Sequence, residues 1–141
     1  YRMTEMQAAL GLSQLSRLNL FIEQRNTLAE YYNLAFAKTD LTVLLPYNNN
    51  YSAYHLYIVL LPERKKHERE QIITTLRNHN IFAHVHYIPI HLQPYYQNLG
   101  FNKGDYPIAE SYYQRAISLP IYPRLTRDEQ NYIINTLKSL L

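Results

Sequence analysis

The 141-residue sequence contains no cysteine, no tryptophan and only three glycines. Without cysteine, neither a disulfide framework nor a cysteine-ligated metal site is possible. No apolar run approaches the roughly 20 residues that a helix needs to span a membrane. We expect no signal peptide, since the first residues do not follow the pattern of one. From these absences we expect a soluble protein of the cytoplasm with no membrane partner.

An excess of charge of one sign is also lacking, since 14 basic and 11 acidic residues give a net charge of +3. That charge is too small and too evenly spread to indicate a nucleic-acid partner. The one basic cluster, residues 64–70, is interrupted by Glu68 and Glu70 and stands where a helix is predicted to begin. We interpret it as a solvated helix face and not as a phosphate-binding patch.

Two capping boxes are the clearest local signals that are present. Residues 4–7 (TEMQ) and 126–129 (TRDE) follow the pattern in which a Thr and a Glu or Gln bond reciprocally to backbone N–H groups at a helix start. Apolar residues then recur at helical spacing after each box. We therefore predict a helix from Thr4 to about Lys38 and a closing helix after Thr126.

The predicted first helix is longer than a domain of this size needs, so we expect it to extend between domains or subunits. Its apolar face should be larger than the rest of the chain can cover. The large residues on that helix are Leu10, Leu12, Leu15, Leu18, Phe21, Ile22, Leu28, Tyr31 and Tyr32.

The remaining pattern predicts a small α+β domain over residues 39–141, after a long helix over residues 1–38. Strands are predicted at 54–61, 81–88 and 117–119, where β-branched and aromatic residues concentrate. Helices are predicted at 67–79, closed by Asn80, at 94–99, closed by Gly100, and at 107–116, with Pro107 in the first turn. We expect about three strands with helices on one side of the sheet.

No self-sufficient catalytic site is visible, and the densest polar and aromatic stretch is residues 84–96. His84 and His86 would share one face of the predicted strand, as two metal ligands can. The nearest acids are Asp105 and Glu110, so carboxylate support for a metal is missing nearby. Two interpretations stay open: a turn through Pro89 that presents His91 and Tyr95 to a pocket rim, and histidines that satisfy backbone groups. We predict no metal site.

Several segments resemble, in the same order, the DegT/DnrJ/EryC1/StrS aminotransferases, which are sugar-nucleotide enzymes of pyridoxal 5′-phosphate (PLP) fold type I. Residues 1–9 (YRMTEMQAA) resemble the family segment N-Y-R-M-T-E-x-Q-A-A. Residues 86–96 (HYIPIHLQPYY), 99–105, 109–113 and 118–123 are similar to further family segments. The most similar branch makes UDP-4-amino-4,6-dideoxy-N-acetyl-β-L-altrosamine in pseudaminic acid biosynthesis. The resemblance implies the small C-terminal domain of such an enzyme.

In that family a lysine links covalently to PLP, and an amine passes from L-glutamate to a 4-keto sugar nucleotide. The resemblance places those cofactor residues in a large domain that precedes Tyr1. The five lysines of this chain do not match the family's PLP-binding motif; they are Lys38, Lys65, Lys66, Lys103 and Lys138. The resemblance therefore implies no catalytic residue here, and the chain alone is expected to be inactive and to bind no PLP.

The resemblance also implies two binding regions in a homodimer. Tyr1 and Arg2 would lie beside the PLP phosphate of the other subunit, although Arg2 is equally compatible with a surface arginine near a chain terminus. His91 would contact the sugar or diphosphate of the sugar nucleotide, with Tyr87, Gln93 and Tyr95 as neighbours.

Two alternative functions remain open from the sequence. One is an aminotransferase of another sugar branch, such as one that makes perosamine or aminoarabinose. The other is a non-catalytic, free-standing module that binds carbohydrate or drives assembly.

Overall fold

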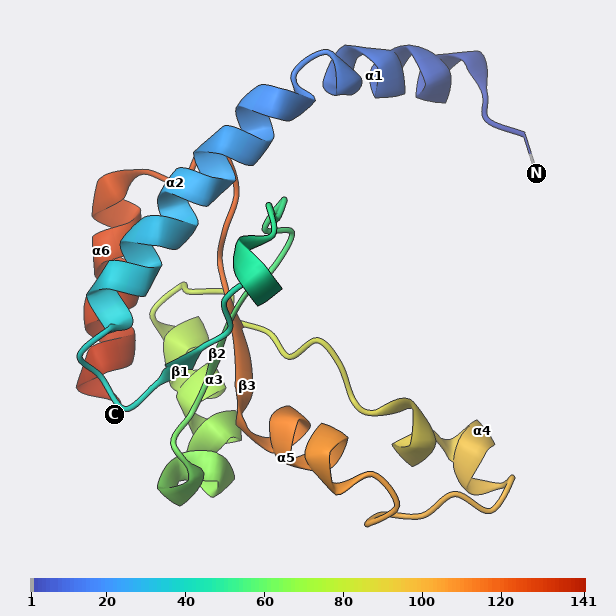
Figure 1. Cartoon of the computed structure of the whole chain (residues 1–141), viewed down its shortest axis with the longest axis vertical. Helices are drawn as coiled ribbons and strands as arrows, with labels where there is room; N and C mark the ends of the chain where they lie inside the picture. Colours follow the sequence, from blue (N-terminus) through green and yellow to red (C-terminus); the bar gives the residue numbers. More distant parts are fainter. Residues whose placement is uncertain (1) are drawn as a thin grey trace.

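A computed structural model describes residues 2–141 of the chain (Figure 1). Its α-helices and strands are, in order, α1 (Glu5–Leu15), α2 (Leu18–Phe36), β1 (Thr42–Val43), β2 (Tyr57–Leu60), α3 (Arg69–Asn78), α4 (Pro94–Gln97), α5 (Pro107–Arg115), β3 (Ala116–Leu119) and α6 (Arg127–Ser139). Three 3₁₀ turns lie between them: η1 (Tyr47–Asn49), η2 (Glu63–Glu68) and η3 (Ile90–Leu92). The prediction for Tyr1 lies outside the described residues.

The three strands form one antiparallel sheet in the order β1-β2-β3. Tyr57 pairs with Leu119, and Val59 pairs with Ile117. These four side chains belong to one buried cluster because alternate residues of a strand point to the same face of the sheet. Helices α2, α3 and α6 supply most of the other members of that cluster, and the segments between the elements supply the rest. The predicted α+β architecture, with helices on one side of the sheet, is confirmed.

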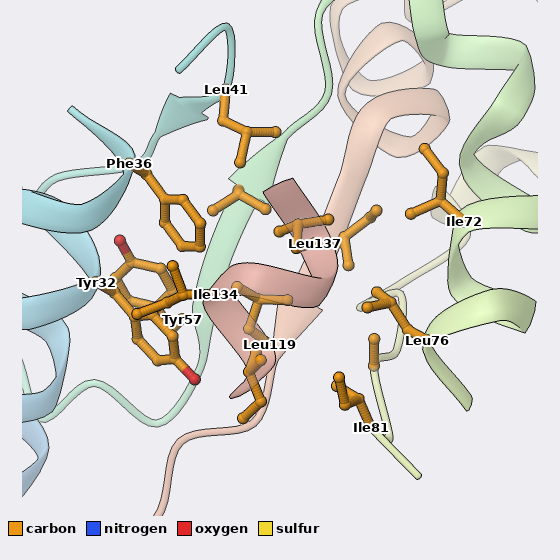
Figure 2. Close-up of a cluster of buried hydrophobic side chains, with 14 of the residues drawn as sticks. Tyr32, Phe36, Leu41, Tyr57, Ile72, Leu76, Ile81, Leu119, Ile134 and Leu137 are labelled. Carbon is orange, nitrogen blue, oxygen red and sulfur yellow. The ribbon is translucent and has the colours of Figure 1, made fainter. Parts of the chain in front are cut away.

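Helix α6 occupies the centre of this core. Figure 2 shows Ile134 and Leu137 between side chains of α2, such as Phe36, and side chains of α3, such as Leu76. The buried Gln130 donates from Nε2 to the carbonyl oxygen of Leu28 at 2.7 Å. Because a polar group inside an apolar core must be hydrogen-bonded, this contact fixes the register of α6 against α2.

Two tyrosines link α2 to the sheet. The rings of Tyr32 on α2 and Tyr57 on β2 stack with their centroids 4.7 Å apart. The hydroxyl of Tyr32 donates to the carbonyl of Pro120, and the hydroxyl of Tyr57 donates to Oδ1 of Asn33. Burial raises the pKa of both hydroxyls far above the ordinary value, so both remain protonated donors.

The predicted single helix from Thr4 to Lys38 is wrong, because the chain turns at Ser16 and Arg17. The N–H of Arg17 donates to the carbonyl of Gln14 at 3.0 Å, and the Ser16 hydroxyl donates to the carbonyl of Ser13 at 2.9 Å. A serine hydroxyl that bonds to a nearby backbone carbonyl offers the chain an alternative to the helical ladder. Helix α2 starts afresh at Leu18, and Figure 1 shows the bend.

The exposed apolar face predicted for this region is confirmed in its first half. Helix α1 buries no residue, and Leu10, Leu12 and Leu15 are each more than 60% exposed. In the second half, Leu28, Ala29, Tyr32 and Phe36 are buried in the common core. The division of the chain at residues 38 and 39 stays a prediction.

The predicted strand over residues 81–88 is also wrong. Only His84 pairs with the sheet, through an isolated bridge in which its N–H donates to Ser118 and its carbonyl accepts from Ser118. Ile81 and Ala83 are nevertheless buried. The alternating pattern therefore corresponds to a segment that lies along the sheet edge and pairs with it at one residue. The third strand of the sheet is instead the two-residue strand β1, which pairs with β2 and was not predicted.

The helix boundaries agree better with their local signals. Both capping boxes are formed, at Thr4 and at Thr126. Asn80 has φ +60° after α3, and Gly100 has φ +100° after α4, as helix-closing residues require. Pro107 stands at the start of α5. The first two residues of the predicted 67–79 helix are instead part of η2, and α3 begins at Arg69.

Candidate functional site

The segment that carries most of the predicted site residues leaves the sheet edge after His84 and extends away from the core toward α4 (Figure 1). His86 still touches the sheet, because its Nδ1 lies 2.8 Å from the hydroxyl oxygen of Ser118. Burial lowers the pKa of His86, and the neighbouring His84 and His55 lower it further. This favours a neutral imidazole at the point where the segment departs.

His91 is buried in η3, only 7% exposed, and pairs with a carboxylate of α5. Its Nε2 lies 2.9 Å from Oε1 of Glu110. The same oxygen accepts the N–H of Gly104 at 2.6 Å. The hydrogen bond from His91, followed by that from Gly104, holds the pKa of Glu110 below its usual range. The carboxylate is therefore ionised at neutral pH and acts only as an acceptor.

A cavity of about 360 Å³ lies beside this pair. The ring of Tyr106 packs against the ring of His91, with centroids 4.8 Å apart. The cavity is mainly apolar and is lined by Pro89, Ile90, His91, Tyr96, Phe101, Tyr106 and Ala109. An apolar hollow with one polar side chain is the usual form of a small-molecule site. Of the two side chains predicted at a pocket rim after Pro89, His91 lines this cavity and Tyr95 does not. Their roles in binding stay predictions.

The predicted neighbours of His91 lie elsewhere on the same segment. Tyr87 is 73% exposed and Tyr95 is 69% exposed, and neither lines the cavity. Gln93 is half-buried and precedes α4 as its N-cap residue. Tyr87 and Tyr95 thus lie on the surface, Gln93 is half-buried, and none of the three lines the cavity beside His91. Arg2 is exposed before α1.

Neither Glu110 nor Tyr106 is predicted from the sequence as a site residue. In the sequence Glu110 is only one of the acids nearest to the histidines. No local signal marks Glu110 as inward-facing, since an acidic residue in the first turn of a helix is common and can face either inward or outward. Nothing in the spacing of 19 residues between His91 and Glu110 shows that the two side chains meet.

The described residues include no group of three or more side chains with the geometry to hold a metal ion. His84 and His86 come within 6.0 Å, measured between ring centroids, without a third ligand beside them. None of the described helices combines the length and the apolar character that a membrane span requires.

The lysines do not fit a covalent PLP anchor. Lys38, Lys103 and Lys138 are exposed. Lys65 pairs with Glu68 at 2.9 Å, and Lys66 pairs with Glu63. An amine that forms an imine must be neutral for part of the time, which requires burial or a cationic neighbour. These five amines are solvated or paired with carboxylates, so they are unsuited to hold the cofactor.

The chain matches one protein family and its solved structures over almost its whole length. The model of the DegT/DnrJ/EryC1/StrS aminotransferase family matches residues 1–138. Relatives include the spore coat polysaccharide biosynthesis protein SpsC of Bacillus subtilis, 36% identical over 99% of this chain and 37% of SpsC. GDP-perosamine synthase of Vibrio cholerae is 32% identical over 99% of this chain and 38% of its own length.

A third relative is the UDP-4-amino-4,6-dideoxy-N-acetyl-β-L-altrosamine transaminase of Helicobacter pylori, 34% identical over 99% of this chain and 37% of its own length. Among solved structures, the putative sugar aminotransferase Spr1654 of Streptococcus pneumoniae aligns with a TM-score of 0.93 and 34% identity, over 99% of this chain and 35% of Spr1654. PseC of Helicobacter pylori aligns with a TM-score of 0.92 and 32% identity, over 99% of this chain and 38% of PseC. The chain thus spans little more than a third of the proteins that it matches.

Proposed function

The chain belongs to the DegT/DnrJ/EryC1/StrS aminotransferase family, and we propose that it is the C-terminal domain of a sugar-nucleotide aminotransferase. In this proposal the whole protein uses PLP to move an amino group from L-glutamate to a keto sugar. The observation that carries it is the TM-score of 0.93 to Spr1654, whose PLP and PMP forms are among the solved structures. When bound, PLP supplies the electron sink of the reaction.

The part of the reaction assigned to this chain is binding and orientation of the sugar nucleotide. Because its lysines are solvated or ion-paired, the cofactor would be held by a large domain outside these residues. We assign His91 as a contact to the sugar or diphosphate, with Tyr87, Gln93 and Tyr95 along the same segment. His91 is 7% exposed, so it reaches a ligand through the cavity that it lines.

A second contact would come from the start of the chain. Arg2 is exposed ahead of α1, and a guanidinium suits a phosphate because it offers several donors in one plane. We propose that Arg2 lies beside the PLP phosphate of the other subunit in a homodimer, with Tyr1 next to it.

For the substrate we propose a UDP-linked 4-keto-6-deoxy amino sugar, as in pseudaminic acid biosynthesis. The likeness of residues 86–96 to that branch and the 34% identity to the Helicobacter pylori transaminase support it. A perosamine-type substrate is the second candidate, because the Vibrio cholerae synthase is 32% identical over the same region. An aminoarabinose-type substrate is a further alternative, which the same substrate assay tests.

A direct assay separates these substrates. The whole protein is supplied with PLP, L-glutamate and one keto sugar nucleotide at a time, and amino sugars are detected by mass spectrometry. We expect turnover of the UDP-linked substrate. Turnover of a GDP-linked substrate alone would reassign the branch. Carbohydrate binding without turnover of any of them would instead support the non-catalytic module.

The variant His91→Ala tests the proposed contact. Loss of the hydrogen bond between His91 and the substrate should lower catalytic efficiency for the keto sugar nucleotide roughly tenfold if its partner is an uncharged sugar group, and up to about a hundredfold if its partner is the diphosphate. The visible absorbance of PLP bound to the whole protein should stay unchanged. Melting temperature is measured on the same variant. A lowered melting temperature with unchanged efficiency would remove the substrate contact and leave a structural histidine.

The cofactor assignment has its own test on the 141-residue chain. Mixed with PLP, this chain should form no covalent adduct, because its described lysines are exposed or paired with carboxylates. A visible absorbance band that borohydride abolishes would contradict this. The whole protein, treated in the same way, is the positive control.

A further inference from the structure

One carboxylate connects three segments of the candidate site. Oε1 of Glu110, on α5, lies 2.9 Å from Nε2 of His91 on η3 and 2.6 Å from the N–H of Gly104 in the loop between α4 and α5. The side chains of His91 and Glu110 are 7% and 9% exposed. The contacts join residues that are 19 and 6 positions apart, so they hold the segment to α5.

We propose that Glu110 is a positioning residue for the sugar-nucleotide site, which orients the ring of His91 and fixes the Gly104 turn beside it. This inference rests on the proposed function, since it assumes that His91 contacts the substrate. Glu110 itself touches no ligand in this arrangement and acts through His91.

The chemistry of the pair determines what His91 can offer a ligand. A carboxylate can only accept hydrogen bonds, so the Nε2 atom that faces Glu110 carries a hydrogen. In a neutral ring the other nitrogen, Nδ1, is then an acceptor. It can receive a sugar hydroxyl or an amide N–H. Donation to a phosphate oxygen would require a second proton on the ring.

The second contact stabilises the wall of the cavity. Gly104 has φ +101°, a conformation that favours glycine, and its N–H is held by Glu110. Tyr106, two residues later, packs on the His91 ring and lines the cavity together with it. Loss of the carboxylate would therefore leave the buried ring N–H of His91 and the backbone N–H of Gly104 without their shared acceptor. The ring of His91 and the Gly104 turn would both lose this attachment to α5.

The variants Glu110→Gln and Glu110→Ala separate positioning from other roles. Oε1 of Glu110 accepts the hydrogen bonds from both His91 and Gly104. The amide oxygen of Gln in Glu110→Gln can accept both in the same place, whereas the Ala side chain in Glu110→Ala accepts neither. Glu63→Ala is the matched control, because Glu63 also has a pKa lowered by a side-chain partner but lies on the exposed η2.

The first readout is ¹⁵N NMR of the histidine rings in the 141-residue chain. His91 should show the Nε2–H form in the wild type and in Glu110→Gln, and should lose that preference in Glu110→Ala. A wild-type His91 with its hydrogen on Nδ1 and none on Nε2 would overturn the inference, whatever the enzyme assay shows.

The second readout is steady-state kinetics of the whole protein with the keto sugar nucleotide that it accepts. Glu110→Ala should lower kcat/KM about tenfold, mainly through KM, whereas Glu110→Gln and Glu63→Ala should stay within about threefold of the wild type. If Glu110→Ala does not fold, Glu110→Asp takes its place, because its shorter carboxylate cannot reach both donors.

The outcomes distinguish the two proposals. Wild-type efficiency in Glu110→Ala, with the His91 preference lost, would overturn the positioning role and leave the proposed function intact. Loss of efficiency in Glu110→Ala together with rescue in Glu110→Gln supports both. A wild-type protein that converts no keto sugar nucleotide would overturn the proposed function and the positioning role with it, while the NMR result would still describe the pair.

Discussion

Helices α1 and α6 both begin at a capping box in which a threonine and a residue three positions later bond to each other's backbone N–H. After that shared start the two helices differ. Helix α6 buries Gln130, Ile133, Ile134 and Leu137. Helix α1 buries no residue, and Leu10, Leu12 and Leu15 are exposed. Figure 1 shows α1 extending away from the sheet and α6 lying beside α2.

The comparison separates two contributions to a helix. A cap satisfies backbone donors in the first turn, and this local event depends on four consecutive residues. Burial depends on whether other segments present a complementary surface, and α6 finds such surfaces on α2 and α3. Most helix stability in proteins comes from that packing. We therefore expect equivalent substitutions in α1 and α6 to have unequal effects.

The largest difference should appear between Leu137→Ala and Leu12→Ala. Leu137 is fully buried, and its truncation leaves a cavity, so the free energy of unfolding should fall by about 2–5 kcal/mol. Leu12 is 71% exposed, and its truncation should change that free energy by less than about 0.5 kcal/mol. Urea unfolding of the 141-residue chain measures both. Equal losses of unfolding free energy in the two variants would show that α1 unfolds together with the core.

The capping threonines offer a second, smaller contrast. Thr126→Ala should cost about 1 kcal/mol of global stability, because α6 unfolds together with the core. Thr4→Ala should reduce helical circular dichroism and leave the urea midpoint unchanged, since the turn at Ser16 and Arg17 separates α1 from α2. A shift of the midpoint in Thr4→Ala would contradict this separation.

The two caps should also differ in their response to acid. Hydrogen bonds from the N–H of Thr126 and then from its hydroxyl hold the pKa of Glu129 below its ordinary value. A lowered folded-state pKa stabilises the protein above the unfolded pKa, and this contribution is lost as the pH falls through the folded pKa. The cap of α1 uses the uncharged Gln7 and should not respond.

Unfolding free energy as a function of pH, compared between the wild type and Glu129→Gln, isolates this contribution from those of Glu63 and Glu110. The wild type should lose more stability on acidification than the variant. Parallel profiles would show that the charge of Glu129 contributes nothing to the cap.

The smallest effect on folding is expected from polar substitutions on α1. Replacing Leu12 and Leu15 by glutamine should leave stability unchanged, because both side chains are exposed. It should reduce self-association of the 141-residue chain, which an uncovered apolar face promotes. Sedimentation velocity measures the change. Association that persists in this double variant would place the contact on another surface, such as that of Tyr87 and Tyr95.

Local signals predicted much of the secondary structure. The boxes at Thr4 and Thr126, the glycine after α4 and the proline at the start of α5 all lie where expected, because each acts on backbone groups within a few residues. The errors came where periodicity alone was used. Residues 81–88 alternate as a strand does, but only His84 finds a partner, since pairing requires a neighbouring strand of matching length and position.

The candidate site shows the same contrast between local signals and contacts of distant segments. The residues of the segment around His91 pointed to a family and to a pocket after Pro89, because the motif is continuous in the chain. The sequence by itself determined the capped starts of α1 and α6, the closing residues after α3 and α4, the apolar faces and the family. Only the tertiary structure decided which face is covered, and that His91 faces Glu110 while Tyr87 and Tyr95 face solvent. The physical reason is that burial and pairing between distant residues depend on the packing of whole elements, which no local pattern of residues specifies.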